Sequence, residues 1–186
     1  MDQNADSKGQ LPHKAHGGAE RPFLPLAIKV LTVSDSRTLE TDKSGAFLQT
    51  SCEGAGHKVL QREVHPDEAS ILQQKVRDWC SEEEVDVVLV TGGTGVTRRD
   101  VSPEAIEPLY DKPLHGFGEL FRHLSYAEIG TSCIQSRASA GLVGRTLVFL
   151  MPGSTGACRL ALEDIILPQL DARTRPCSFA ELRDSL

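Results

Sequence analysis

The sequence lacks a long hydrophobic run and any paired-cysteine motif. No stretch approaches about 18 consecutive apolar residues, and the N-terminus has no basic start followed by an apolar segment, so we expect neither a membrane span nor a secretory signal. The five cysteines are scattered without a CxxC pair, and their odd number cannot all pair within the chain. This usage favours a reducing compartment, and we expect a cytoplasmic protein.

The chain also has little excess basic charge and no metal-binding histidine motif. Twenty Lys and Arg stand against 26 Asp and Glu, a net charge of -6 that disfavours sequence-independent binding of nucleic acid. The six histidines form no HExxH motif and no cluster with cysteine, so we expect surface or loop histidines and no zinc site. With 186 residues, of which 39% are hydrophobic, the chain can bury one core without disulfides or a structural metal.

The first 25 residues differ in composition from the rest of the chain. They are polar, rich in Gly, His, Lys and Pro, and almost without large apolar side chains before Phe23. We therefore predict a flexible N-terminal tail over residues 1–25. No repeat and no second linker follow, so we predict one ordered domain over residues 26–180.

Beyond the tail, short apolar runs alternate with helical patterns, which is typical of parallel strands linked by crossover helices. The run Val-Asp-Val-Val-Leu-Val at 85–90 is apolar enough for a central strand covered on both faces. We predict a helix that begins at Ser102, with this serine as its N-cap. The other expected strands are 27–33, 57–64 and 146–151, and the other expected helices are 44–55, 68–80, 117–129 and a last one that ends at 166, before Pro168.

Polar loops follow each expected strand. In an open parallel sheet the ligand crevice lies beyond the carboxyl ends of the strands, so we expect these loops to converge at one edge. The Gly-rich loop after the central strand is the most distinctive, because its glycines let backbone amides approach an anion and its threonines add hydroxyl donors. It is not a Walker loop, and from spacing alone an anion site and a tight turn fit equally well. The loops contain Ser34-Asp35-Ser36-Arg37, His65-Pro66-Asp67-Glu68, Thr91-Gly92-Gly93-Thr94-Gly95 and Pro152-Gly153-Ser154.

Two carboxylates and several cations in or near these loops are suited to nucleotide chemistry. Asp100 follows Arg98 and Arg99, and together with Asp67 it could hold Mg²⁺ and align a phosphate oxygen against the α-phosphorus of a nucleotide. The residues alone also allow structural roles. Asp67 could cap the next helix, and the two arginines could be solvated turn charges.

Two further positions carry the same ambiguity. Ser154 could bind an anion at a helix start or simply cap that helix. Arg137, next to Ser136 in a Gly- and Ser-rich segment to which we assign no strand, could contact a phosphate. By itself a Ser-Arg pair carries little information.

Taken together, the motifs resemble the MoaB/Mog family of molybdopterin-binding proteins, which acts in molybdenum cofactor biosynthesis. The resemblance covers about residues 26–179, and three further segments, at 128–132, 151–155 and 168–177, resemble one branch of the family. The motifs that carry it are Leu-Thr-Val-Ser-Asp at 31–35, Asp-Lys-Ser-Gly at 42–45, Thr-Gly-Gly-Thr-Gly at 91–95, Asp100 with Ser-Pro-Glu-Ala at 102–105, Gly-Phe-Gly-Glu at 116–119, Ser-Arg at 136–137 and Pro-Gly-Ser at 152–154.

This resemblance implies a three-layer α/β domain with helices on both faces of a mostly parallel sheet, assembled as a trimer or hexamer. It also implies binding of molybdopterin near the Gly-rich loop, with Mg²⁺ and ATP as co-substrate in the members that adenylylate the terminal phosphate. By position, Asp67 and Asp100 match the catalytic and metal-binding carboxylates. The positions that match substrate-binding motifs are Ser34, Asp35, Thr91, Gly92, Gly93, Thr94, Gly95, Glu119, Ser136, Arg137, Pro152, Gly153 and Ser154.

Three functions are open at this point. The leading one is a molybdopterin adenylyltransferase, because this chain keeps both carboxylates, whereas some members of the branch depart from the one matching Asp67. The alternative is a non-catalytic protein that binds or carries molybdopterin for other proteins of the pathway. The third function, that of a nucleotide-binding regulator, is supported by fold analogy alone. We expect neither nucleic acid nor membrane as a partner.

Overall fold

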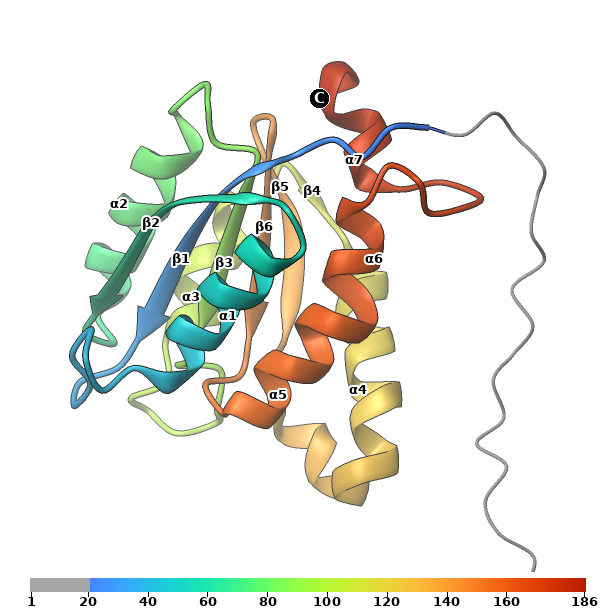
Figure 1. Ribbon diagram of the computed structural model, residues 1–186. Helices are drawn as coiled ribbons and strands as arrows, with labels where there is room; N and C mark the ends of the chain where they lie inside the picture. Colours follow the sequence, from blue (N-terminus) through green and yellow to red (C-terminus); the bar gives the residue numbers. More distant parts are fainter. Residues whose placement is uncertain (1–20) are drawn as a thin grey trace, which may run out of the picture.

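The computed structural model describes residues 21–186, without the side chain of Asp184, so most of the expected tail lies outside the described residues. Its centre is one six-stranded sheet with the order β2-β1-β3-β6-β5-β4 (Figure 1). The first four strands in this order run parallel to one another, and β5 runs antiparallel to both of its neighbours. The strands are β1 (Ala27–Val33), β2 (Lys58–His65), β3 (Val87–Thr91), β4 (Lys112–Pro113), β5 (Ser139–Val143) and β6 (Thr146–Met151).

Helices cover both faces of this sheet, which confirms the predicted three-layer α/β domain (Figure 1). On one face pack α1 (Lys43–Gly54), α4 (His115–Ile129) and a helical stretch made of α5 (Thr155–Arg159), a π-helical segment (Leu160–Ile166) and α6 (Leu167–Leu170). On the other face pack α2 (Ala69–Cys80) and α3 (Ser102–Ile106). Short turns of helix complete the chain at Glu107–Leu109, Gly130–Gln135, α7 (Phe179–Leu182) and Arg183–Ser185.

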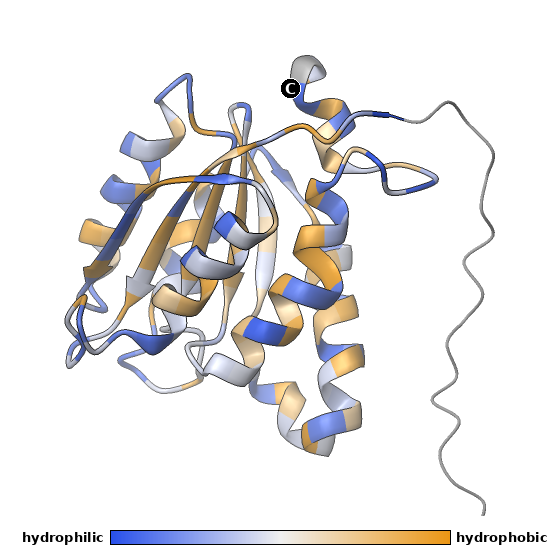
Figure 2. Ribbon diagram, viewed as in Figure 1, coloured by the Kyte–Doolittle hydropathy of each residue, from blue (hydrophilic) through white to orange (hydrophobic). Residues whose placement is uncertain are grey.

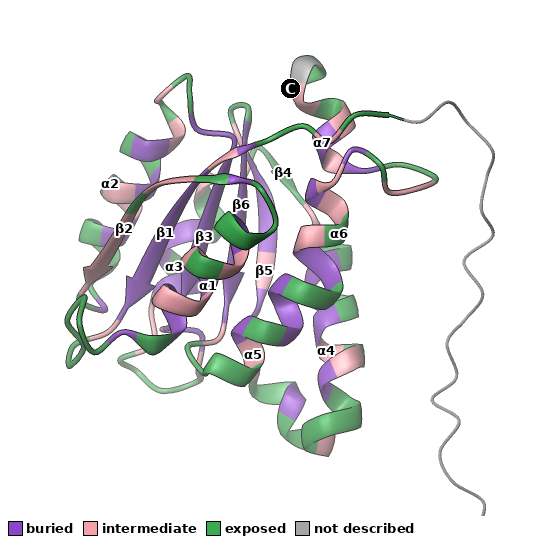
Figure 3. Ribbon diagram, in the orientation of Figure 1, coloured by how far each residue is buried: buried purple, intermediate pink, exposed green. Residues whose placement is uncertain are grey.

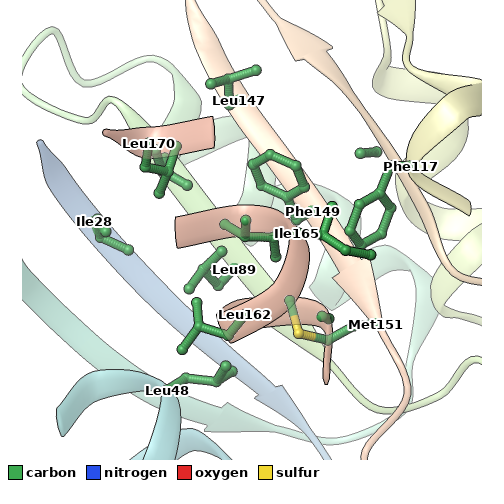
Figure 4. Packing of buried hydrophobic residues seen from close by; sticks show 14 of the residues in the cluster. Ile28, Leu48, Leu89, Phe117, Leu147, Phe149, Met151, Leu162, Ile165 and Leu170 are labelled. Carbon is green, nitrogen blue, oxygen red and sulfur yellow. The ribbon is translucent and has the colours of Figure 1, made fainter. Parts of the chain in front are cut away.

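The alternation of side chains along β3 divides the core into two halves. Leu89 packs toward α1 and the stretch that contains Leu162, whereas Val88 and Val90 pack toward α2 and α3. Figure 4 shows Leu89, Phe149 and Leu162 meeting on the first of these faces. The central strands are accordingly the most hydrophobic and the most buried part of the fold (Figures 2 and 3). A strand buried on both faces is apolar at nearly every position, as the run at 85–90 predicted.

The structure differs from the prediction in the segment before Gly144, where β5 forms although no strand was assigned. Its Ser- and Gly-rich sequence reflects close packing. A Cβ atom at Gly141 would lie 2.3 Å from Cγ of Tyr110, so an aromatic ring occupies the space that a side chain would need. The strand is therefore held by its ladder with β6 and β4 and by this ring contact, neither of which local propensity reveals.

The predicted end of the last long helix before Pro168 is also wrong, because helical structure continues to Leu170. Proline removes an intrahelical hydrogen bond and its ring clashes with the preceding turn. Here the seven-residue π-helical segment Leu160–Ile166 comes directly before Leu167 and Pro168. Its wider turn accommodates the ring without ending the helix.

One histidine lies in a loop, as expected, but is buried there. His57 is only 6% exposed, and its Nδ1 atom accepts a hydrogen bond from the backbone N–H of Leu26 at 3.2 Å. The ring of Phe23 lies against it, with 5.1 Å between the ring centroids. Burial lowers the pKa of His57. Within residues 21–186, no helix is long and apolar enough to cross a membrane.

Candidate active site

The polar loops converge at the carboxyl edge of the parallel strands, as expected, and border a cleft of about 670 Å³. Loops after β1, β3 and β6 form one side of this cleft, and α4 with the helical turn after it forms the other. The predicted site residues that line the cleft are Ser34, Gly92, Gly93, Thr94, Gly95, Asp100, Ser136, Pro152, Gly153 and Ser154.

The other predicted residues lie outside the cleft lining. Asp35, Asp67 and Thr91 belong to the same loops but face protein groups. Glu119 and Arg137 line a second cleft, of about 680 Å³, between α3, α4 and β5.

Asp100 is held at the cleft by its own loop. Its Oδ2 atom accepts hydrogen bonds from the backbone N–H of Thr97 at 3.0 Å and from the Thr97 hydroxyl at 2.5 Å. The hydroxyl is the main reason that the pKa of Asp100 lies below its ordinary value, so this carboxylate is ionised at neutral pH. A Cβ atom at Gly95 would lie 2.7 Å from Oδ2, and glycine therefore lets the loop close over the carboxylate.

Arg137 forms hydrogen bonds with the backbone of the same loop. Its Nε atom donates to the carbonyl oxygen of Thr94 at 3.2 Å, and its Nη2 atom donates to the carbonyl oxygen of Asp100 at 2.9 Å. Its Nη1 atom pairs with the carboxylate of Glu104. The structure thus places the Arg137 guanidinium among protein acceptors, where it fixes the course of the loop between Thr94 and Asp100.

Asp67 lies beneath the Gly-rich loop and is only 8% exposed. The alternative that it caps α2 is wrong, because Glu68 is the N-cap of that helix and makes no side-chain cap bond. Instead, Oδ1 of Asp67 accepts the backbone N–H of Val101 at 3.2 Å, at the start of α3. Burial raises the pKa of Asp67, although this N–H opposes the shift.

Gly93 makes room for Asp67 and for a buried serine hydroxyl. Its φ of +62° favours glycine, and a Cβ atom there would lie 2.3 Å from Oγ of Ser102 and 2.7 Å from Oδ2 of Asp67. Ser102 is not the predicted N-cap, because Val101 occupies that position. Its fully buried hydroxyl points toward Gly93, and no group in residues 21–186 forms a hydrogen bond with it.

Arg99 is a solvated turn residue, with its side chain 54% exposed, and it also connects three of the converging loops. Its Nε and Nη2 atoms each donate to a carboxylate oxygen of Asp35 at 2.7 Å, and its Nη1 atom donates to Oε1 of Glu68 at 2.9 Å. These contacts tie the loop after β3 to the loops after β1 and β2. Hydrogen bonding to Arg99 lowers the pKa of Asp35 to about 2.

Thr91 and Ser154 have structural partners as well. The fully buried Thr91 hydroxyl donates to the carbonyl oxygen of Pro152 at 2.9 Å and joins the ends of β3 and β6. Oγ of Ser154 accepts the backbone N–H of Ala157 at 3.2 Å and caps α5, while Ser154 also borders the cleft.

Among the lining residues that sequence reasoning did not assign to the site are Arg37, Lys43 and Ser44. The last two begin α1, whose N-cap is Asp42, and Oδ1 of Asp42 accepts the backbone N–H of Gly45 at 2.8 Å. The Ser44 hydroxyl donates to the carbonyl oxygen of Gly153 at 2.9 Å, which brings the start of α1 to the loop after β6. The Asp-Lys-Ser-Gly motif at 42–45 signalled a helix start, but not that this start opens into the cleft.

Asp67 and Asp100 do not form a complete metal site. Among residues 21–186, no group of three or more His, Cys, Asp or Glu side chains could hold a metal ion. Mg²⁺, however, commonly binds through one or two carboxylates, with substrate phosphates and water as the remaining ligands. In the described chain, Oδ2 of Asp67 accepts no hydrogen bond and Asp100 borders the cleft. Asp100 at the cleft and the free oxygen of Asp67 beneath the adjoining loop are the groups that would hold such an ion.

Comparison with known proteins gives concordant matches. Residues 29–172 match the family model described as a probable molybdopterin binding domain. The chain is 52% identical over 157 residues to molybdenum cofactor biosynthesis protein B of Escherichia coli (strain K12), covering 84% of this chain and 92% of that protein. A crystal structure of molybdenum cofactor biosynthesis protein B has a TM-score of 0.78 at 50% identity, with 81% and 94% covered. The tungsten cofactor synthesizing protein MoaB from Pyrococcus furiosus has a TM-score of 0.68 at 36% identity, with 76% and 90% covered.

Proposed function

The chain belongs to the MoaB/Mog family of molybdopterin-binding proteins and acts in molybdenum cofactor biosynthesis; from this premise we propose that it is a molybdopterin adenylyltransferase. It binds molybdopterin in the cleft at the ends of β1, β3 and β6 and transfers AMP to the terminal phosphate from ATP. The observation that carries the proposal is the ionised Asp100 at the cleft, with Asp67 beneath the adjoining Gly-rich loop.

In the reaction, an oxygen of the molybdopterin phosphate attacks the α-phosphorus of ATP. A new P–O bond forms, the bond between the α-phosphorus and its bridging oxygen breaks, and pyrophosphate leaves. Mg²⁺, bound by Asp67 and Asp100 together with the phosphates, would neutralise the charge that develops on the phosphate oxygens. Because this chemistry depends on alignment and electrostatics, the protein acts mainly by positioning the two phosphate groups.

The protein groups suited to binding the phosphate groups come from several loops. The exposed cations Arg37 and Lys43 lie at the cleft, and Lys43 stands at the start of α1, where the positive end of the helix dipole also favours an anion. The backbone of Gly93 to Gly95 supplies further amides near Asp100. Arg99 and Arg137 are engaged by protein acceptors, so we assign them to holding the loops in place.

The test is to incubate the purified protein with molybdopterin, ATP and Mg²⁺ and to measure adenylylated pterin and pyrophosphate. Asp100→Asn should abolish both products, because an amide binds Mg²⁺ poorly, while molybdopterin still binds. Asp164→Asn, which makes the same change at an exposed position outside the cleft, should leave turnover unchanged.

Two outcomes would contradict the proposal. If Asp100→Asn turned over normally, Asp100 would not have the assigned role. If the wild-type protein bound molybdopterin but released no pyrophosphate, the chain would be a binding or carrier protein that delivers molybdopterin to other proteins of the pathway.

We also infer that the protein works as a homo-oligomer, a trimer or a hexamer. Three large apolar side chains on α4 and the turn after it are exposed outside the cleft: Leu120 at 44%, Tyr126 at 61% and Ile134 at 79%. Exposed apolar surface of this kind favours association between copies. Light scattering on the purified protein measures the mass directly, and a monomer of 20.2 kDa would contradict the inference.

A further inference from the structure

The wall of the cleft opposite the Gly-rich loop is one face of α4. Phe121, Ser125, Glu128 and Ile129 all line the cleft, and their spacing of i, i+4, i+7 and i+8 places them on one side of the helix. Phe121 and Ser125 are buried at the base, whereas Glu128 and Ile129 are exposed. This wall contributes no residue to the adenylyl transfer proposed above.

Glu128 is distinctive among the acids that line the cleft. The carboxylate of Asp42 accepts bonds from Thr32, Gly45 and Arg62, and the carboxylate of Asp100 accepts two bonds from Thr97. Glu128, by contrast, forms no hydrogen bond or ion pair with any of residues 21–186. Both of its carboxylate oxygens are therefore available to a ligand.

The position of Glu128 is also unfavourable for the helix that carries it. It lies in the last turn of α4, next to Ile129 and the C-cap Gly130, and that turn contains no basic residue. A negative charge near a helix C-terminus is repelled by the partial negative charge of the unpaired carbonyl groups. A residue that breaks a local rule without a structural partner points to a role in function.

Apolar groups line the same cleft as Glu128. Ile129 is 54% exposed on the α4 side, and Ala157 and Leu160 line the cleft from α5 and the π-helical segment after it. The π-helical segment packs against α4, and Figure 1 shows these two helices side by side. A cleft lined by apolar groups and by an acceptor-only carboxylate suits a heterocycle with paired N–H donors.

From this placement we propose that Glu128 is the specificity-determining residue for the pterin ring, with its carboxylate accepting the adjacent N3–H and 2-amino N–H donors. The proposal rests on the function proposed above. The two donors lie side by side in the ring plane, like those of a guanidinium group, and a carboxylate accepts such a pair with two parallel hydrogen bonds. Glu128 thus recognises the N–H donors at the edge of the pterin ring, and the polar groups near Asp100 bind the terminal phosphate of molybdopterin.

The test compares two ligands that differ only at this edge. Pterin-6-carboxylate has the 2-amino group, whereas lumazine-6-carboxylate has a carbonyl oxygen in its place, so that an acceptor replaces a donor. We expect the wild-type protein to bind the pterin roughly 10- to 100-fold more tightly in a fluorescence titration, because one charged hydrogen bond is lost with the lumazine. Glu128→Gln should lower this ratio to about 1 or reverse it, because an amide matches the donor and acceptor of lumazine.

Glu84→Gln is the matched control, because Glu84 is exposed and does not line the cleft, and it should keep the wild-type ratio. Equal ratios for the wild-type protein and Glu128→Gln would overturn the assignment of Glu128. If pyrophosphate release from ATP and molybdopterin were intact in that case, the proposed function would stand without this inference. If the wild-type protein bound neither ligand nor molybdopterin, both would fail.

Discussion

Replacing Gly93 by alanine tests how tightly the Gly-rich loop is fitted to the groups beneath it. Gly93 has a φ of +62°, and its added Cβ atom would lie 2.3 Å from Oγ of Ser102 and 2.7 Å from Oδ2 of Asp67. Both contacts are far shorter than van der Waals separation. Both groups are buried, with Ser102 at 0% and Asp67 at 8% exposure, so neither can move into solvent without opening the loop.

The loss of stability has two parts, and a second glycine separates them. Gly144 has nearly the same backbone angle, φ +59°, but no atom within 4 Å of its would-be Cβ. Gly144→Ala should therefore cost only the left-handed backbone strain, roughly 1–2 kcal/mol. Gly93→Ala adds overpacking, typically about 1–3 kcal/mol, which gives a total of about 2–5 kcal/mol. The smaller entropy of the unfolded alanine chain affects both variants equally.

Urea unfolding at one fixed protein concentration measures this difference. In a protein of this size, each kcal/mol also lowers Tm by about 2–4 °C, so the two variants should be distinguishable by thermal unfolding. Adding Ser102→Ala to Gly93→Ala should recover part of the loss, because it removes the nearest atom. If Gly93→Ala were no less stable than Gly144→Ala, the close approach of Asp67 and Ser102 to the loop would be refuted.

Three further predictions concern ion pairs and titration. Arg62→Met should cost about 3–5 kcal/mol in urea unfolding, because it leaves the carboxylate of Asp42, which is 2% exposed, without its cation; a loss below about 1 kcal/mol would contradict this. Lowering the pH through about 6.5 should destabilise the wild-type protein more than the His57→Gln variant. Burial lowers the pKa of His57 in the folded state, so the unfolded chain binds the extra proton at a higher pH than the folded chain does. Equal pH profiles of stability for the two proteins would exclude this contribution. Arg99→Gln should raise the pKa of Asp35 from about 2 toward its ordinary value in an NMR titration, and an unchanged pKa would show that Arg99 does not bind Asp35.

The sequence predicted the parts of the fold that depend on local pattern. The apolar run at 85–90 indicated a central strand, and β3 is buried on both faces. It could not reveal β5, because the glycine in the middle of Ser139–Val143 is explained by the ring of Tyr110, which is distant in the chain. Likewise, the burial of His57 follows from its contacts with Leu26 and Phe23, which no local pattern indicates.

At the candidate site, the sequence indicated which loops converge but not which way their side chains point. The residues Arg99 and Arg137 illustrate this, since a guanidinium near a Gly-rich loop predicts anion binding equally well whether it faces the ligand or the protein. Lys43 and Ser44 were missed for the converse reason. Their motif indicates a helix start, and only the packing of α1 beside the loop after β6 brings that start to the cleft.

Arg99 and Arg137 hold the loops of the cleft in place, so these loops are ordered before a ligand binds. Arg99 joins the loops after β1, β2 and β3, and Arg137 fixes the segment between Thr94 and Asp100. Loops that are already held in place lose little conformational entropy on binding, and a carboxylate such as Asp100 is then positioned before a ligand binds. The charged groups of the cleft lining that the loops do not use themselves are Lys43 at the start of α1 and Glu128 on the wall of α4.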